Sequence, residues 1–125
     1  MIDFTRLNLN NKEPVYVQIA SFVKKQILAG SAKSGEELPS RRELAALLGI
    51  NPNTVQKAYR LMEEEGYVRT LSNSGSIIYT DEKILSAVGN EFTKELVAHF
   101  VKAAKDINMT FKQTIDLISE VWDEI

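Results

Sequence analysis

Residues 53–64 carry amide, hydroxyl and cationic side chains at a spacing that suits nucleic-acid binding. Projected at about 100° per residue, the segment separates into two faces, and Val55, Ala58, Tyr59 and Met62 share the apolar one. Amides and long cations can hydrogen-bond base edges and phosphates, and the major groove of DNA admits one helix. The alternative is a helix face that meets only water. The polar face holds Asn53, Gln56, Lys57, Arg60 and Glu64, with Thr54 at its N-terminal end.

Residues suited to catalysis or metal binding are few. The sequence has one histidine, His99, and no cysteine, so His99 lacks partners for zinc binding or for activating a nucleophile. A packing role explains it better. The acidic runs at 63–65 and 123–124 fall at a helix end and at the C-terminus, where solvated charge explains them, and no glycine-rich phosphate loop is present. The sequence therefore predicts no enzyme, no metal site and no cofactor.

The elements that must position the polar face are written in residues 38–55. Ser40 and Glu43 predict a capping box that opens a first helix. Gly49 predicts its left-handed end, and Asn51 with Pro52 predicts the start of the next helix. Two short helices with separate start signals and a glycine turn indicate a helix-turn-helix, which favours nucleic-acid contact over a solvated face.

A β-hairpin is expected after the second helix ends at Gly66. Residues 67–70 and 77–80 are rich in β-branched and aromatic side chains, and the turn between them contains Asn73 and Gly75. Directly after a helix-turn-helix, such a hairpin is the wing of a winged helix. A plain structural hairpin is the alternative.

Residues from about 14 to 80 resemble the DNA-binding domain of GntR-family bacterial transcription regulators. The resemblance, over just over half of the chain, implies a dimeric repressor, and the residues around Asn51 and the short tail after Thr80 are similar to the YtrA-like branch. It rests on Pro14-Val15-Tyr16, Gln18-Ile19, Leu38-Pro39-Ser40, Arg42-Glu43-Leu44-Ala45, Leu48-Gly49, Asn51-Pro52-Asn53-Thr54-Val55, Lys57-Ala58-Tyr59 and Glu65-Gly66.

The resemblance also implies roles for individual residues. Arg42 matches the arginine at the helix start that family members use on DNA, and it ranks first. Asn53 and Thr54 match positions used for backbone and base contacts. Gln56 stands where many members have a base-reading arginine, and glutamine favours adenine. The expected DNA-binding set is Arg41, Arg42, Asn51, Asn53, Thr54, Gln56, Lys57, Arg60, Ser74 and Gly75.

Some members of this set have more specific expectations. Lys57 and Arg60 are expected on phosphates, whereas Arg41 is either an extra cation or a solvated surface charge. Gly75 matches the second wing glycine, but Asn73 replaces the first and the wing tip lacks cations. Asparagine can adopt the left-handed conformation. Contact with the minor groove is therefore expected from Ser74, Gly75 and backbone amides.

Composition and charge agree with a small DNA-binding protein that has an acidic tail. The chain has 125 residues, 44% of them hydrophobic, and a net charge of -2. Residues 1–80 carry ten Lys and Arg against eight Asp and Glu, or +2, while residues 81–125 carry five against nine, or -4. No apolar run is long enough to span a bilayer, and a chain without cysteine fits a reducing compartment. We expect a cytoplasmic protein with no membrane partner.

Residues 81–125 are expected to form two amphipathic helices that pair with a second copy of the chain. Ile84, Val88 and later apolar residues recur at four-residue steps to about Asp106, and a second helix with a heptad-like seam begins at Thr110. The alternative is a monomer whose tail folds onto its own winged helix. An effector would have to sit between subunits near the aromatics, which are better explained as dimer core. The expected dimerisation residues are Phe92, Leu96, Phe100, Phe111, Ile115, Ile118 and Trp122.

The predicted fold is therefore mainly α with a small β-hairpin (α+β), a winged helix-turn-helix over residues 1–80 followed by a two-helix dimerisation hairpin over residues 81–125. Residues 1–13 pack either on the domain or on the partner subunit. The expected partner is double-stranded DNA with a palindromic operator, because two recognition helices about 34 Å apart read successive major grooves. Repression near transporter genes is what the family implies. A protein-association module with an idle recognition face is the competing hypothesis.

Overall fold

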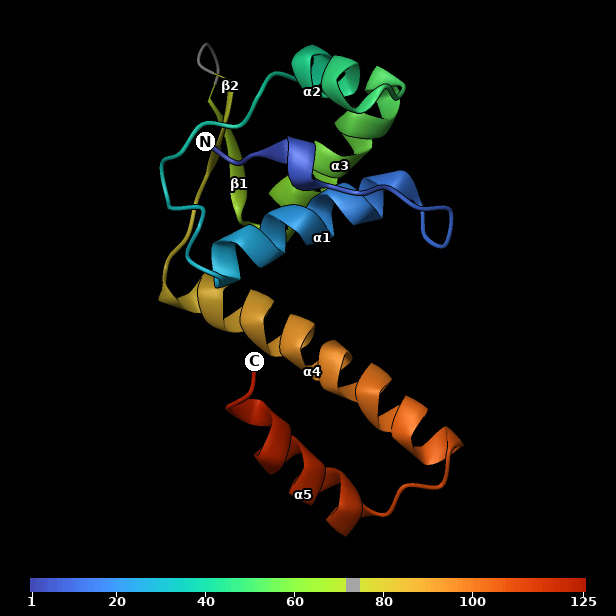
Figure 1. The fold of residues 1–125 in the computed structure, drawn as a ribbon. Coiled ribbons are helices and arrows are strands. Elements are labelled where there is room, and N and C mark those ends of the chain that lie inside the picture. The colour runs from blue at the N-terminus through green and yellow to red at the C-terminus, as the bar shows by residue number, and fades with distance from the viewer. Residues whose placement is uncertain (72–74) are drawn as a thin grey trace. The chain divides into compact units, whose positions relative to one another are not determined.

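The computed structural model describes residues 1–71 and 75–125. Its contacts divide the chain into two compact units, Met1–Val88 and Gly89–Ile125. The first contains the 3₁₀-helix η1 (Phe4–Arg6), the helices α1 (Val15–Leu28), α2 (Arg41–Leu48) and α3 (Pro52–Glu65), and the strands β1 (Val68–Leu71) and β2 (Gly75–Ile78) (Figure 1). The helix α4 (Glu82–Asp106) begins in the first unit and continues into the second, which also contains α5 (Phe111–Trp122). This element order confirms the predicted fold class.

The helix-turn-helix forms where the local sequence signals place it. The Oγ of Ser40 accepts the N–H of Glu43 at 3.1 Å, which is the serine half of the predicted capping box. Gly49 ends α2 in the left-handed conformation, with φ 68°. Asn51 then caps α3, because its Oδ1 accepts the N–H of Asn53 at 2.8 Å, and Pro52 takes the first helical position.

The wing is joined to the rest of the domain by a third extended segment. β1 and β2 are antiparallel, and Thr70 lies opposite Ser76. Residues 35–38 run along the other edge of β2: the N–H of Leu38 donates to the carbonyl of Ser76 at 2.9 Å, and the N–H of Ile78 donates to the carbonyl of Glu36 at 2.8 Å. β2 therefore lies between β1 and residues 35–38.

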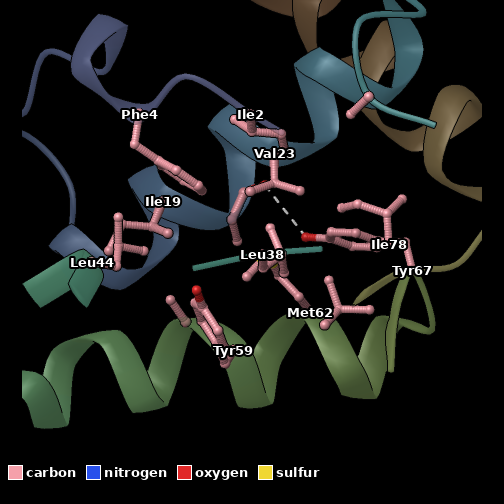
Figure 2. Close-up of a cluster of buried hydrophobic side chains, with 14 of the residues drawn as sticks. Ile2, Phe4, Ile19, Val23, Leu38, Leu44, Tyr59, Met62, Tyr67 and Ile78 are labelled. Atoms are coloured by element: carbon pink, nitrogen blue, oxygen red, sulfur yellow. Dashed lines mark hydrogen bonds between the residues drawn. The ribbon is translucent and has the colours of Figure 1, made fainter. Parts of the chain in front are cut away.

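One hydrophobic core holds the first unit together, and Figure 2 shows side chains from the helices and the hairpin meeting in it. The predicted apolar face of α3, which includes Tyr59 and Met62, is fully buried. Burial of one Ile, Leu or Met side chain contributes about 1.5–3 kcal/mol, so this cluster is the main stabilising feature. The largest fully buried side chains are Tyr59, Tyr67, Ile19, Leu44, Met62, Ile78, Val23, Val55 and Val68.

The N-terminal segment packs on its own domain, which decides between the two alternatives that the sequence left open. Ile2 and Phe4 are buried in the core, and the Phe4 ring lies 5.6 Å from the ring of Phe22. The side-chain amide of Gln18 holds the following loop, accepting the N–H of Asn10 at 2.9 Å and donating to its carbonyl at 2.8 Å. The segment thus forms part of the helical unit.

Most of the large apolar side chains of the second unit are exposed. The chain turns back after Asn108 and continues into α5 (Figure 1). α5 begins at a complete capping box between Thr110 and Gln113, and none of its residues is buried. Phe111 is 83% exposed and Trp122 is 77% exposed. A groove of about 790 Å³ between α4 and α5 is lined by Leu96, Val97, Phe100, Met109, Thr114, Leu117, Ile118, Val121, Trp122 and Ile125. Of the expected dimerisation residues, Phe92, Phe111 and Ile115 do not line it.

Candidate nucleic-acid interface

The polar face of α3 is open to solvent along a single stripe. Asn53, Gln56, Lys57 and Arg60 follow at helical steps of three and four residues, so they lie on the same side of the helix. Asn53, Lys57 and Arg60 are exposed, and Gln56 is half-buried. Thr54, also half-buried, lies in the first turn. The opposite face of α3 is fully buried, so the helix that carries these polar side chains is held in place.

Three of the predicted cations have no acidic partner. Among the residues that the structure describes, Arg42, Lys57 and Arg60 form no salt bridge. Arg42 is exposed in the first turn of α2. The Nζ of Lys57 lies 5.7 Å from the centroid of the Tyr16 ring on α1, and the residue is exposed. These three charges are available to phosphates.

Arg41 and Asn51 are placed differently from the free cations. Arg41 is half-buried, its Nη2 lies 3.2 Å from Oε1 of Glu63, and its guanidinium carbon lies 4.8 Å from the centroid of the Tyr59 ring. Asn51 is exposed, but its side-chain oxygen is engaged in capping α3. Both residues therefore have structural partners within the domain.

The wing contributes one described member of the predicted set. Gly75 is exposed at the start of β2 with φ 77°, a conformation that favours glycine. Ser74 and Asn73, which the sequence singles out at the wing tip, lie outside the described residues. Arg69 on β1 is exposed and stacks on the ring of Tyr79.

Glu63 and Glu65, which were expected to be solvated charges, have defined partners. Glu63 binds Arg41 and also accepts the hydroxyl of Thr70 at 2.8 Å. Glu65 binds Lys24 on α1 at 2.9 Å. Both residues are exposed, as expected of solvated charges, but each also has an ion-pair partner on another helix. Their partners are distant in sequence, so no local spacing pointed to them.

The histidine and the acidic residues of the described chain form no metal-binding group. His99 is exposed on α4 rather than packed, so the predicted packing role is not seen in the single chain. Within residues 1–71 and 75–125, no group of three or more His, Cys, Asp or Glu is arranged to hold a metal ion. In the same residues, no helix is long and apolar enough to cross a membrane.

Known proteins resemble this chain over most of its length. The model for bacterial regulatory proteins of the gntR family matches residues 15–78. The Bacillus subtilis HTH-type transcriptional repressor YtrA is 37% identical over 102 residues, which cover 76% of this chain and 78% of YtrA. The uncharacterized B. subtilis HTH-type transcriptional regulator YhcF is 31% identical, covering 85% of this chain and 88% of YhcF. A solved GntR family transcriptional regulator from Listeria monocytogenes superposes with a TM-score of 0.79 at 27% identity, covering 90% of this chain and 99% of that one.

Two helices joined through a left-handed glycine, followed by a hairpin on the same core, define a winged helix-turn-helix protein of the DNA-binding class. With the matches above, the chain belongs to the GntR family of bacterial transcriptional regulators, in the YtrA-like branch. It is a DNA-binding regulator and not an enzyme. These findings confirm the family and the functional class that the sequence predicts.

Proposed function

We propose that the chain is a dimeric repressor that binds a palindromic operator close to transporter genes. The observation that carries the DNA-binding part is the stripe of polar side chains on α3, which form no salt bridge with any described residue and whose helix is fully buried on its opposite face. In this proposal Gln56 reads a base edge with Asn53 beside it. Arg42, Lys57 and Arg60 bind phosphates, and Gly75 and Ser74 of the wing approach the minor groove.

Exposed apolar side chains on the tail support the dimer. α5 has twelve residues and buries none of them, and an isolated helix of that length is marginal in water. Packing its apolar side, with Ile118 and Trp122, against a second copy would stabilise both tails. We propose that residues 81–125 form this dimerising tail and residues 1–80 form the DNA reader. Twofold symmetry would then place two α3 helices on two half-sites.

Repression is proposed because B. subtilis YtrA, of which this chain covers 78%, is named a repressor. A bound dimer would block access of the transcription machinery to the operator. Such a regulator acts in the cytoplasm, where bacterial chromosomal DNA lies.

Fluorescence anisotropy with duplex from the DNA upstream of the gene tests DNA binding. We expect affinity to fall as salt rises, and Arg42→Ala to lower both the affinity and the salt slope, by about one unit of slope per lost phosphate contact. Lys83→Ala is the matched control, because it removes an exposed cation from the first turn of α4, beyond the C-terminal end of α3. If binding is independent of salt and insensitive to Arg42→Ala, the chain is a protein-association module instead.

Base readout by Gln56 needs a separate comparison. Gln56→Ala should weaken operator binding by about 1–3 kcal/mol while leaving affinity for random duplex nearly unchanged, because a bidentate amide contact discriminates between bases. Equal losses on both duplexes would rule out a reading role for Gln56.

A further inference from the structure

One carboxylate, that of Glu63, connects α2, α3 and the wing. It lies in the last turn of α3, and its Oε1 is 3.2 Å from Nη2 of Arg41, the first residue of α2. The same oxygen accepts the hydroxyl of Thr70 on β1 at 2.8 Å. Three elements that are separate in sequence therefore meet at a single oxygen atom.

The hydrogen bonding continues across the hairpin from Thr70 to Ser76, and the donor and acceptor of that bond can be assigned. The Oγ1 of Thr70 lies 2.9 Å from Oγ of Ser76, its cross-strand partner on β2. A threonine hydroxyl has one hydrogen, and Thr70 donates it to Glu63, so Ser76 must be the donor to Thr70. Ser76 is buried, at 3% exposure. Both wing strands are thus tied to the last turn of α3.

The Arg41 side chain is held from a second side by Tyr59. The guanidinium carbon lies 4.8 Å from the centroid of the Tyr59 ring, one helical turn before Glu63. The Tyr59 side chain is fully buried and its hydroxyl donates to the carbonyl of Pro39. Burial raises the pKa of the Tyr59 phenol well above its usual range, although the charge of Arg41 opposes this, so the hydroxyl stays a donor. The guanidinium of Arg41 therefore lies between a buried ring and a carboxylate.

We propose that Arg41 and Glu63 are positioning residues of the DNA-reading surface. They hold the first turn of α2, which carries Arg42, and both wing strands in one arrangement against α3. Arg41 does not bind phosphate in this assignment, because its charge is compensated by Glu63. The inference rests on the proposed DNA-binding function and deepens it.

A positioning role and a phosphate-binding role for Arg41 predict opposite changes in operator affinity when Glu63 is replaced. If Arg41 were a phosphate ligand restrained by Glu63, Glu63→Gln would release it and tighten operator binding. A positioning pair predicts that Glu63→Gln weakens operator binding by about fivefold, within the range of coupling between contacting residues. Arg41→Gln should weaken binding similarly while leaving the slope of log K against log salt unchanged. Arg42→Gln should lower that slope by about 0.9.

Glu65→Gln is the matched control for Glu63→Gln. It removes the same charge from the same turn of α3, but Glu65 binds Lys24 on α1 instead of α2 or the wing. We expect Glu65→Gln to leave operator affinity unchanged or slightly higher, since it removes a negative charge. If the two variants behave alike, the effect of Glu63 is general electrostatics and the inference is wrong.

A neutral variant removes the wing connection without altering charge. Thr70→Val keeps the β-branched shape that suits β1 and deletes the hydroxyl. Thr70→Val should lower operator affinity while leaving the salt slope constant.

The double variant Arg41→Gln with Glu63→Gln tests whether the two residues act together. It should bind operator no more weakly than whichever of the two single variants has the lower affinity. Thermal unfolding of each variant confirms that it is folded at the assay temperature. Additive losses in the double variant, or unchanged binding by Thr70→Val, overturn the inference.

These results remain distinguishable from failure of the proposed function. If the wild-type protein binds no operator duplex, the DNA-binding proposal itself fails. If the wild-type protein binds and Glu63→Gln binds more tightly, only the positioning role fails.

Discussion

Arg69 and Tyr79 stack across the base of the wing, with the guanidinium carbon of Arg69 3.4 Å from the centroid of the tyrosine ring. The two residues are diagonal neighbours on one face of the hairpin, because Arg69 lies opposite Ile77. The Tyr79 hydroxyl then donates to Oδ2 of Asp81 at 3.0 Å, and Oδ1 of Asp81 accepts the N–H of Ile84 at 2.8 Å. The wing is therefore connected through side chains to the beginning of α4.

Replacing Tyr79 should separate the contribution of the ring from that of the hydroxyl. Tyr79→Phe keeps the stacking on Arg69, whereas Tyr79→Leu loses it, so we expect the leucine variant to be less stable by about 0.5–1 kcal/mol, the usual strength of an exposed cation–π contact. Urea unfolding followed by circular dichroism measures the difference. Equal stabilities of the two variants would mean that the stack contributes nothing.

Asp81 should make the stability of the first unit depend on pH in acid. The N–H of Ile84, and after it the hydroxyl of Tyr79, hold the pKa of Asp81 below its ordinary value of 3.8. A carboxyl whose pKa is lower in the folded state stabilises the fold above its unfolded pKa and loses this effect as the pH falls through the folded pKa. Thermal unfolding should therefore show wild type more stable than Asp81→Asn at neutral pH, with the two curves converging below pH 3.8. A gap of constant size down to that acid range contradicts the assignment.

Gly49 should resist substitution for conformational reasons alone. Its φ is 68°, and a Cβ placed there would meet no atom within 4 Å. Gly49→Ala should therefore cost about 1–2 kcal/mol from the left-handed backbone and not from a clash. Gly49→Asn should cost less, since asparagine tolerates this region. Denaturant unfolding of both variants checks the order, and an alanine variant as stable as wild type would refute it.

Truncating Met62 should test how much the packing of α3 against the core contributes to the free energy of unfolding. The side chain is fully buried, so Met62→Ala should lower the free energy of unfolding by about 2–5 kcal/mol. Leu47→Ala is the matched control because Leu47 is 54% exposed on α2, and we expect a change within about 0.5 kcal/mol. Similar losses for the two variants would place Met62 outside a tightly packed core.

Trp122 can report on the proposed dimer directly. It is the chain's single tryptophan and is 77% exposed in the isolated chain. Burial against a second copy should shift its emission to shorter wavelength as protein concentration rises, in step with the mass measured by sedimentation. Ile118→Asp should abolish both changes, because a carboxylate would be buried in the seam, while Glu120→Ala on the same helix should not. A monomeric mass at all concentrations would refute the dimer.

The helices α2 and α3 were predictable because the sequence signals for their starts and ends act locally. Ser40, Gly49, Asn51 and Pro52 each act through backbone conformation or a hydrogen bond within three residues, and all four occupy the expected caps, turn and first helical position. The apolar face of α3 follows from periodicity alone. Such features need no knowledge of tertiary structure.

The contacts between elements were not predictable, because they join residues that are far apart in the sequence. Arg41 and Glu63 are 22 residues apart, and the choice of Arg41 over Arg42 as the paired cation depends on how α2 crosses α3. Residues 35–38, in the loop before α2, pair with β2, about 40 positions further along the chain. Pairing across such distances depends on the packed fold, and a single sequence contains no local pattern for it.

The central place of β2 has a consequence for the motion of the wing. An isolated two-stranded ribbon is marginally stable in water, and its amides would exchange readily with solvent. Here the N–H of Ile78 is bonded to Glu36, and the carbonyl of Ile78 accepts the N–H of Gly35 at 2.7 Å. The amide of Ile78 should therefore exchange with deuterium only when the whole helical domain opens. Such exchange would make the base of the wing part of the same cooperative folding unit as the helices, rather than a flap that detaches on its own.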